Sequence, residues 1–285
     1  MRPGKIIFLS LFSIFLFGII SLLGGYGGHH LKFLAASVLY FAFTYIFIKK
    51  ARNRNEKIVV IIILMLPPAL IYIPIHIMDF KDTLLSFPST LAHFTGICFA
   101  ILLISIHSKK VRLLLISLYL LACMWVAFIG YSKWIHKINF NTFSDNVDYP
   151  IPVSITGRNQ LNQMITPETL EGKIVVLDFW NTRCGACFQK FPQLQDIYDK
   201  YKQTTTIKIL AVDKPFSEDT LNQAFKMLAI RNYTFPILLP DDINLPEKFG
   251  VESYPTTIII NQMGKVVFNG DIENCAPVIE GLLSR

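Results

Sequence analysis

The sequence predicts an α-helical membrane bundle of five transmembrane helices followed by an α/β domain. Of the 285 residues, 52% are hydrophobic, which is too apolar for two soluble domains. Five long apolar runs lie in the first half, whereas the second half alternates short apolar runs with helical patterns. We therefore expect a five-span transmembrane domain at 1–131, a linker at 132–148 and a compact domain at 149–285.

Each apolar run is near the ~20 residues that a helix needs to cross a bilayer. The expected spans are residues 6–23, 31–48, 58–77, 91–107 and 111–131. The first run could pass for a signal peptide, but it lacks a small-x-small cleavage site and further runs follow it, so we expect a retained span. Five spans place the two ends of the chain on opposite sides of the membrane.

Basic residues in the connecting loops predict which side is which. The N-terminus and the loops at 49–57 and 108–112 are rich in Lys and Arg, whereas the loops at 24–30 and 78–90 carry almost none. Because cytoplasmic loops retain the excess of positive charge, the N-terminus should be cytoplasmic and everything after Tyr131 should be periplasmic or its extracytoplasmic equivalent.

The net charge of +7 does not indicate nucleic-acid binding. Residues 1–142 hold 14 Lys and Arg against 3 Asp and Glu, a net +11, and residues 143–285 hold 13 against 17, a net −4. The positive charge therefore belongs to the membrane half, and the second half has no basic patch interleaved with aromatic residues. Nucleic acid is excluded as a partner, and the lipid bilayer is expected as one.

The second half predicts strands alternating with helices. A strand is expected at 151–155, a buried central strand ending at 178–180, and further strands at 207–212, 235–239, 258–260 and 265–268. Helices are expected after Cys184, from Ser217 to about Ile230 with an acidic first turn, at 245–249 and at 276–283. The last two strands flank a turn at Gly264 and should form an antiparallel pair.

Two cysteines, Cys184 and Cys187, follow the central strand directly in C-x-x-C spacing. This spacing puts Cys184 at a helix N-terminus and Cys187 one turn further along the same face. The helix dipole favours negative charge at Cys184, so its thiol should ionise readily and the second thiol is close enough to close a disulfide. The pattern predicts dithiol–disulfide exchange, in which Cys184 attacks and Cys187 resolves the mixed disulfide.

The stretch Asp178 to Cys187, together with Tyr254-Pro255-Thr256, resembles the thioredoxin-fold TlpA/ResA-like membrane-anchored thiol–disulfide oxidoreductases. The resemblance covers about half the chain and implies a thioredoxin-like domain from residue 149 onward. The sequence departs from the W-C-G-P-C motif that is common in the family, because Arg183 replaces the tryptophan and Ala186 replaces the proline. Because residues between the cysteines tune the reduction potential, the redox direction stays open.

The resemblance also implies roles for residues around the pair. Asp178 stands where the family has a buried carboxylate, whose raised pKa would let it take or return the Cys187 proton; a satisfied core carboxylate is the alternative. Pro255 stands where the family has a cis proline that pairs with substrate. Three more residues are expected on the substrate side of the site. Tyr254 either shapes the substrate groove or belongs to the core, and Trp180 either contacts substrate or only packs beneath the site. Arg183 either favours the Cys184 thiolate or is a solvated surface charge.

Neither a metal nor an organic cofactor is expected. Half a zinc site has the same C-x-x-C spacing, but His136 and Cys275 are the only other His or Cys after residue 131 and neither belongs to a paired motif. Cys98 and Cys123 lie in the fourth and fifth spans at similar depth, ~10–12 Å below the outer interface. They are either an electron relay or ordinary small apolar residues.

The sequence thus predicts a membrane-tethered thiol–disulfide oxidoreductase that reduces extracytoplasmic proteins. Apocytochromes c are the typical substrates of the TlpA/ResA-like branch, and a membrane electron donor would be required. Two alternatives remain open: a disulfide oxidase or isomerase of the same fold, and an assembly or sensor protein that binds thiol partners without turnover.

Overall fold

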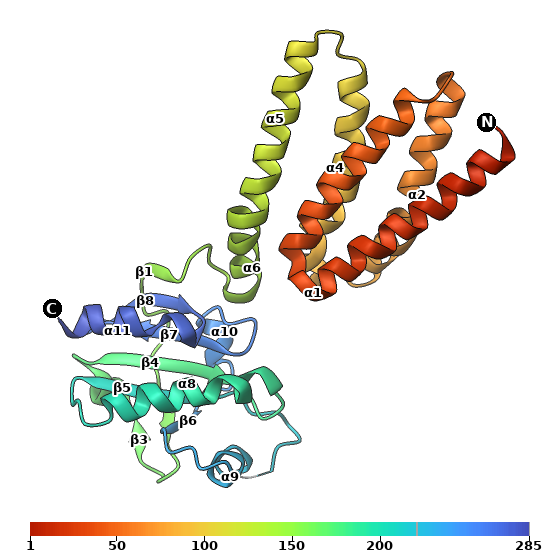
Figure 1. Cartoon of the computed structure of the whole chain (residues 1–285). Coiled ribbons are helices and arrows are strands. Elements are labelled where there is room, and N and C mark those ends of the chain that lie inside the picture. Colours follow the sequence, from red (N-terminus) through yellow and green to blue (C-terminus); the bar gives the residue numbers. More distant parts are fainter. Residues whose placement is uncertain (221, 285) are drawn as a thin grey trace. The chain divides into compact units, whose positions relative to one another are not determined.

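The computed structural model describes residues 1–220 and 222–284. The chain divides into two compact units, residues 1–135 and 136–285, which are described separately (Figure 1). The helical segments that build the first unit are α1 (Pro3–Lys49), α2 (Arg54–Met78), α3 (Phe80–Thr83), η1 (Leu84–Ser86), α4 (Phe87–Ile104), α5 (Lys109–Trp125), η2 (Val126–Gly130) and α6 (Tyr131–Phe140), the last of which runs on into the second unit.

Within the described residues, four continuous helical stretches are long and apolar enough to cross a membrane. They are Pro3–Lys49, Arg54–Met78, Phe80–Ile104 and Lys109–Phe140. The expected count of five is therefore not confirmed, because the first two predicted spans form the single 47-residue helix α1. Gly28 interrupts this helix with φ 69° and ψ −175°, a conformation that is not helical.

The chain reverses direction at Gly28, as the two arms of α1 show in Figure 1. The Phe12 ring lies 4.7 Å from the Phe43 ring and 5.3 Å from the Phe47 ring, measured between centroids. In a straight helix Phe12 and Phe43 would stand about 47 Å apart along the axis. The two arms of α1 therefore pack against each other as an antiparallel helical hairpin.

Helix α4 packs closely on the second arm of α1. A Cβ atom added at Gly96 would lie 2.8 Å from the backbone oxygen of Ser37 and 2.9 Å from the backbone nitrogen of Phe41. Gly96 thus lets the two backbones approach to a distance that a larger residue would prevent. Small residues serve this purpose at helix contacts in membranes.

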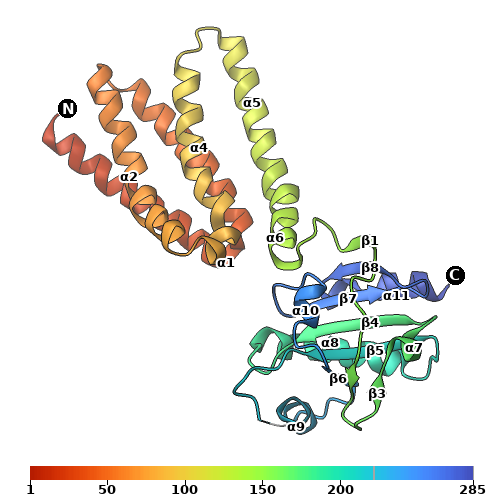
Figure 2. The ribbon, with the colours of Figure 1, turned by 180° about the vertical axis from the view of Figure 1, so that it is seen from behind.

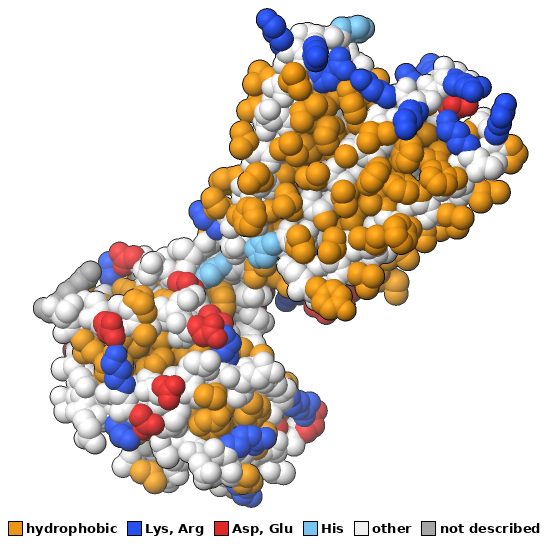
Figure 3. All heavy atoms as spheres, in the orientation of Figure 1, with side chains coloured by type: hydrophobic (Ala, Val, Ile, Leu, Met, Phe, Trp, Pro, Cys, Tyr) orange, Lys and Arg blue, Asp and Glu red, His pale blue; other side chains and the backbone are white. Residues whose placement is uncertain are grey.

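Apolar and basic side chains occupy different parts of the surface of the first unit. Apolar side chains cover the flank of the bundle, and Lys and Arg side chains gather at one end (Figure 3). That end holds the N-terminus, the α1–α2 turn and the α4–α5 turn (Figure 1). The chain leaves the bundle through α6, at the opposite end.

The second unit is built on a mixed sheet. Its strands are β1 (Asn146–Pro150), β2 (Gly157–Arg158), β3 (Met164–Ile165), β4 (Ile174–Trp180), β5 (Ile207–Asp213), β6 (Ile237–Pro240), β7 (Thr256–Ile260) and β8 (Lys265–Gly270). Among the described residues these eight strands lie in the order β1-β8-β7-β4-β5-β6-β2-β3. Strands β4, β5 and β6 are parallel, and β7 runs antiparallel to β4. The central strand β4 is buried along its whole length.

Two apolar layers cover the two faces of this sheet. One layer contains α8 (Gly185–Tyr201), α9 (Gln223–Ile230) and α11 (Ala276–Leu283), which pack on alternate residues of β4 such as Val176 and Trp180. The other contains α7 (Pro167–Leu170) and α10 (Leu245–Lys248), which pack on Val175, Leu177 and Phe179 (Figure 2). Parallel strands buried on both faces have this continuous apolar sequence.

The structure corrects three expectations for this half of the chain. Residues 151–155 do not form a strand; two short strands that follow them, β2 and β3, pair as a hairpin, and β2 also pairs with β6. The helix expected from Ser217 begins at Gln223, since Asp219 accepts hydrogen bonds from the Phe216 backbone and from Thr182. The expected linker contains regular structure, because α6 extends to Phe140 and β1 pairs with the edge of β8.

The conformation of Gly28 gives a test of the α1 hairpin. Replacing Gly28 with Ala should lower the thermal unfolding midpoint of the full chain in detergent, because this backbone region costs a residue with a side chain about 1–3 kcal/mol. Gly18→Ala is the matched control, since Gly18 lies in the first arm with open space around its Cβ position and an ordinary φ. Equal midpoints for the two variants would contradict a reversal at Gly28.

Candidate redox site

Cys184 and Cys187 are joined by a disulfide at the start of α8, as the sequence predicts. Cys184 is the N-cap residue of this helix, and its Sγ accepts a hydrogen bond of 3.0 Å from the backbone nitrogen of Cys187. Cys184 is partly exposed, whereas Cys187 is fully buried. One sulfur is therefore reachable from solvent and stands in the field of the helix N-terminus, where negative charge is stabilised.

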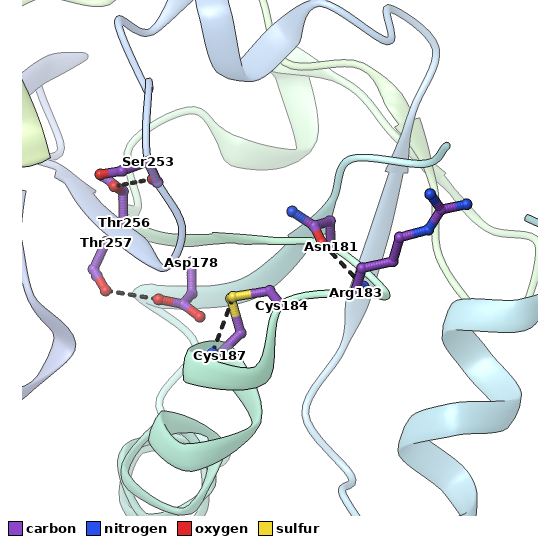
Figure 4. Close-up of a disulfide and its surroundings, with 8 residues drawn as sticks. All are labelled: Asp178, Asn181, Arg183, Cys184, Cys187, Ser253, Thr256 and Thr257. Atoms are coloured by element: carbon purple, nitrogen blue, oxygen red, sulfur yellow. Dashed lines mark hydrogen bonds between the residues drawn. A yellow bond between two sulfur atoms is a disulfide. The ribbon is translucent and has the colours of Figure 1, made fainter. Parts of the chain in front are cut away.

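Asp178 lies beneath the disulfide, on β4, with its side chain turned toward the first turn of α8 (Figure 4). Its carboxylate is 1% exposed and accepts a hydrogen bond of 2.7 Å from Thr257 Oγ1 on β7. Burial raises the pKa of Asp178 to about 7; the Thr257 hydrogen bond acts against this rise, and the charge of Asp271 adds to it. Asp178 can therefore bind and release a proton near neutral pH.

The raised pKa of Asp178 also determines how the free energy of unfolding changes with pH. An unfolded aspartate has a pKa of about 3.9, so between about pH 4 and pH 7 the folded protein holds a proton that the unfolded chain has lost. The contribution of Asp178 to the free energy of unfolding therefore falls as the pH rises through this window and is constant above it.

Trp180 and the Tyr254–Pro255 segment border the site from two sides. Trp180 has no exposed surface and packs edge-on against the rings of Phe188 and Phe191. A residue that contacts substrate must expose some of its surface, and Trp180 exposes none. The packing role expected for Trp180 fits the structure, and the substrate role does not. The Tyr254–Pro255 peptide bond is cis, as the resemblance implies, and Tyr254 is half-buried between the two apolar layers.

Arg183 points away from the sulfur atoms (Figure 4). Its guanidinium donates a hydrogen bond of 2.9 Å to Glu218 and lies 4.4 Å from the centre of the Phe216 ring. The neighbouring Thr182 hydroxyl donates to Asp219. The loop before Cys184 is thus fastened to residues 216–219, and Arg183 is not turned inward toward the thiol.

The other three cysteines are not bonded to one another in the described part of the chain. Cys275 is buried at the N-cap of α11, where burial and the charge of Asp178 raise the pKa of its thiol to about 12. Such a thiol is unreactive at neutral pH. Cys98 is exposed on α4 and Cys123 is buried on α5, so the structure contains no Cys98–Cys123 disulfide.

Two polar residues of the site were missed by the sequence analysis. Thr257 is placed against Asp178 by the antiparallel register of β4 and β7, and Asp213 is placed beside Trp180 by the parallel register of β4 and β5. Neither pairing leaves a local signal in the sequence, because the partners are 79 and 33 positions apart. Only the register of the sheet brings them together.

The part of the chain that holds the disulfide is similar to known proteins. Residues 172–266 match the family described as thioredoxin-like. The thiol-disulfide oxidoreductases ResA of Halalkalibacterium halodurans and ResA of Bacillus subtilis are each 34% identical over 98 residues, which cover 34% of this chain and 53% and 52% of theirs. The chain thus spans about half the length of these two curated relatives. A solved structure of a putative protein disulfide isomerase from Bacteroides thetaiotaomicron is 19% identical, with a TM-score of 0.43, over 50% of this chain and 96% of that one.

Removing the Thr257 hydroxyl should raise the pKa of Asp178 further. A hydrogen bond to a charged group contributes about 1.5–3 kcal/mol, so Thr257→Val should shift the pKa upward by about 1–2 units. The measurement is an infrared titration of the carboxylic acid band that disappears in Asp178→Asn. Thr256→Val is the control, because the Thr256 hydroxyl donates to the Ser253 backbone and not to Asp178. An unchanged or lowered pKa in Thr257→Val would contradict the assignment.

Proposed function

We propose that this chain, whose C-terminal unit is a thioredoxin-like domain, is a membrane-tethered thiol–disulfide oxidoreductase that reduces extracytoplasmic proteins. The observation that carries the proposal is the arrangement of the disulfide: Cys184 is partly exposed at a helix N-terminus, and Cys187 is buried above the carboxyl group of Asp178. The names of the two ResA relatives support the same activity.

The proposed reaction begins with the reduced pair. The Cys184 thiolate attacks one sulfur of a substrate disulfide; that bond breaks, a mixed disulfide forms, and the released substrate thiolate takes a proton from solvent. The Asp178 carboxylate then removes the proton from Cys187, whose thiolate attacks Cys184 and releases the second substrate sulfur as a thiolate. That thiolate takes a proton from solvent, and Asp178 returns its proton to solvent. The substrate gains two electrons and two protons, and the pair becomes the disulfide seen in the structure.

We assign the substrate side of the site to Tyr254 and Pro255. Both belong to the segment that leads into β7, the strand that also carries Thr257. A backbone beside the reactive sulfur can pair with an extended substrate segment in the manner of an added strand. Arg183 borders the opposite, exposed rim, where it meets Glu218 rather than the thiol.

The direction of the reaction and the partners are proposed from the likeness to the TlpA/ResA-like branch. Apocytochromes c are the proposed substrates, which would place the protein in cytochrome c biogenesis. A reductant has to be re-reduced after each turnover, so a membrane electron donor is required, and Cys98 and Cys123 are candidates for a relay. If the Cys184–Cys187 pair had the reduction potential of an oxidant, the protein would instead be a disulfide oxidase or isomerase.

We further propose that residues 1–131 cross the membrane five times. The arms of α1, residues 3–27 and 29–49, are about 38 and 32 Å long, enough for a hydrocarbon core of about 30 Å. Because the Phe12 and Phe43 rings touch, the arms lie side by side and cannot form one crossing. The cluster of Lys and Arg at one end supports a cytoplasmic N-terminus in the cytoplasmic membrane of a bacterium, with residues 149–285 on the periplasmic side.

Labelling in intact cells tests this topology. In a cysteine-free full-length background, Gln262→Cys should react with a membrane-impermeant maleimide, because it lies in the proposed periplasmic domain. Ala51→Cys, in the basic α1–α2 turn, should react only after the cells are permeabilised. The reverse pattern, or labelling of both sites in intact cells, would refute the orientation.

Covalent trapping tests the proposed activity. Cys187→Ser removes the resolving thiol, so substrates should accumulate as mixed disulfides with Cys184 that dithiothreitol releases. Cys184→Ser is the matched control and should trap nothing. If the two variants are alike, the protein is a binder without turnover. The reduction potential of the pair then fixes the direction, since ~−270 mV supports a reductant and ~−120 mV an oxidant.

A further inference from the structure

Trp180 and Asp213 end the two central parallel strands side by side. They are register partners in the β4–β5 ladder, so their side chains leave the sheet on the same face. That face is the one covered by α8, because Val176 and Trp180 of β4 and Ile209 and Ala211 of β5 all belong to the apolar layer that includes Cys187. Asp178 lies on the same face, two residues before Trp180. The backbones of Asp178 and Asp213 are therefore about 8 Å apart.

Both side chains carry a buried polar atom that lacks a partner. Trp180 is 0% exposed and Asp213 is 2% exposed. Neither Trp180 Nε1 nor Asp213 Oδ1 makes a hydrogen bond to any residue that the structure describes. An indole N–H only donates and a carboxylate oxygen accepts, so the two unpaired atoms are complementary. Asp213 therefore carries a buried carboxylate oxygen without a partner among the described residues, on the strand position next to Trp180.

Among residues 1–220 and 222–284, no salt bridge neutralises the Asp213 carboxylate. The adjacent Lys214 is turned away, with its ammonium 2.9 Å from Glu247 and 2.6 Å from the Ile243 carbonyl. The titratable and charged groups that surround Asp213 are Asp178 from β4, Lys214 from the end of β5, Asp219 from the loop before α9, Glu247 from α10 and Tyr254 from the cis-proline segment. Burial, followed by the charge of Asp219, raises the pKa of Asp213 to about 7.

We propose that Asp213, the register partner of Trp180, is a second proton-holding group of the dithiol site, whose proton occupancy follows the redox state of Cys184 and Cys187. Asp213 does not touch the reacting sulfur atoms, so it is a positioning residue that acts through Trp180 and the loop after it. The proposal rests on the proposed function, because it requires a reversible dithiol couple.

The physical reason is repulsion between like charges. In the reduced site the Cys184 thiolate carries a negative charge at the start of α8, and a second negative charge on the same face of the sheet is disfavoured. In the oxidised site the disulfide is neutral, so Asp213 ionises more readily. Reduction of the disulfide by two electrons is then accompanied, near neutral pH, by a rise in the fraction of Asp213 that holds a solvent proton, in addition to the protons that the thiols bind.

Trp180 is itself the reporter for the test. The chain has three tryptophans, so Trp125→Phe with Trp134→Phe leaves Trp180 alone in the full-length protein. Its fluorescence is titrated from pH 5 to pH 9 in detergent, once with the pair oxidised and once with the pair reduced. We expect a transition near pH 7 in both states, with a midpoint at least about 0.5 pH unit higher in the reduced protein.

Two variants separate a proton-holding role from a structural one. Asp213→Asn keeps an oxygen that can accept from the indole but has no proton to titrate, so the transition should vanish. Asp178→Asn should retain it. Where Asp213→Asn does not fold, Asp213→Glu keeps the carboxyl group, and its midpoint must still respond to the redox state. A transition that survives Asp213→Asn, that disappears in Asp178→Asn, or that has the same midpoint in both redox states would overturn the proposal.

This experiment also separates the proposal from the proposed function. The fluorescence titration needs no substrate, so a missing transition in a protein that still traps partners through Cys184 overturns only the role of Asp213. If the pair shows no reversible reduction at all, the proposed function fails as well, and the reduced titration cannot show the expected shift.

Discussion

The register of β4 against its two neighbours places the two buried carboxyl groups beside their neighbours in the sheet. On one side β7 sets Thr257 against Asp178, and on the other β5 sets Asp213 against Trp180. Strand β4 is buried on both faces, so a slip of one residue would exchange the side chains of its two layers and turn Asp178 away from α8. The packing of the core thus fixes the face of the sheet from which Asp178 and Asp213 project, the face that α8 covers.

The sequence was informative wherever the determinants are local. The C-x-x-C spacing after an apolar run is enough to predict a helix N-terminus at Cys184, and the alternation of strands and helices is enough to predict an α/β sandwich. Contacts across the sheet could not be predicted in this way. The partners of Asp178 and Trp180 come from strands far along the chain, and the late start of α9 depends on Asp219 meeting Thr182 of another loop.

The membrane half shows a different limit. Hydropathy locates apolar segments but does not say whether two of them form one helix, two helices or a hairpin. In α1 the hairpin depends on Gly28, whose backbone conformation is rare for residues that have a side chain. It also depends on the aromatic contacts that hold the two arms together. A count of helices and a count of crossings are therefore separate quantities for this chain.

The contacts of Arg183 with Glu218 and Phe216, and of Thr182 with Asp219, have an entropic consequence. They join the segment before Cys184 to a second loop, so the two loops are ordered together. The conformational freedom of this segment is lost when the domain folds and not when a partner arrives. A partner therefore binds to a loop that is already ordered, and its affinity is not reduced by the entropy cost of ordering the loop beside Cys184.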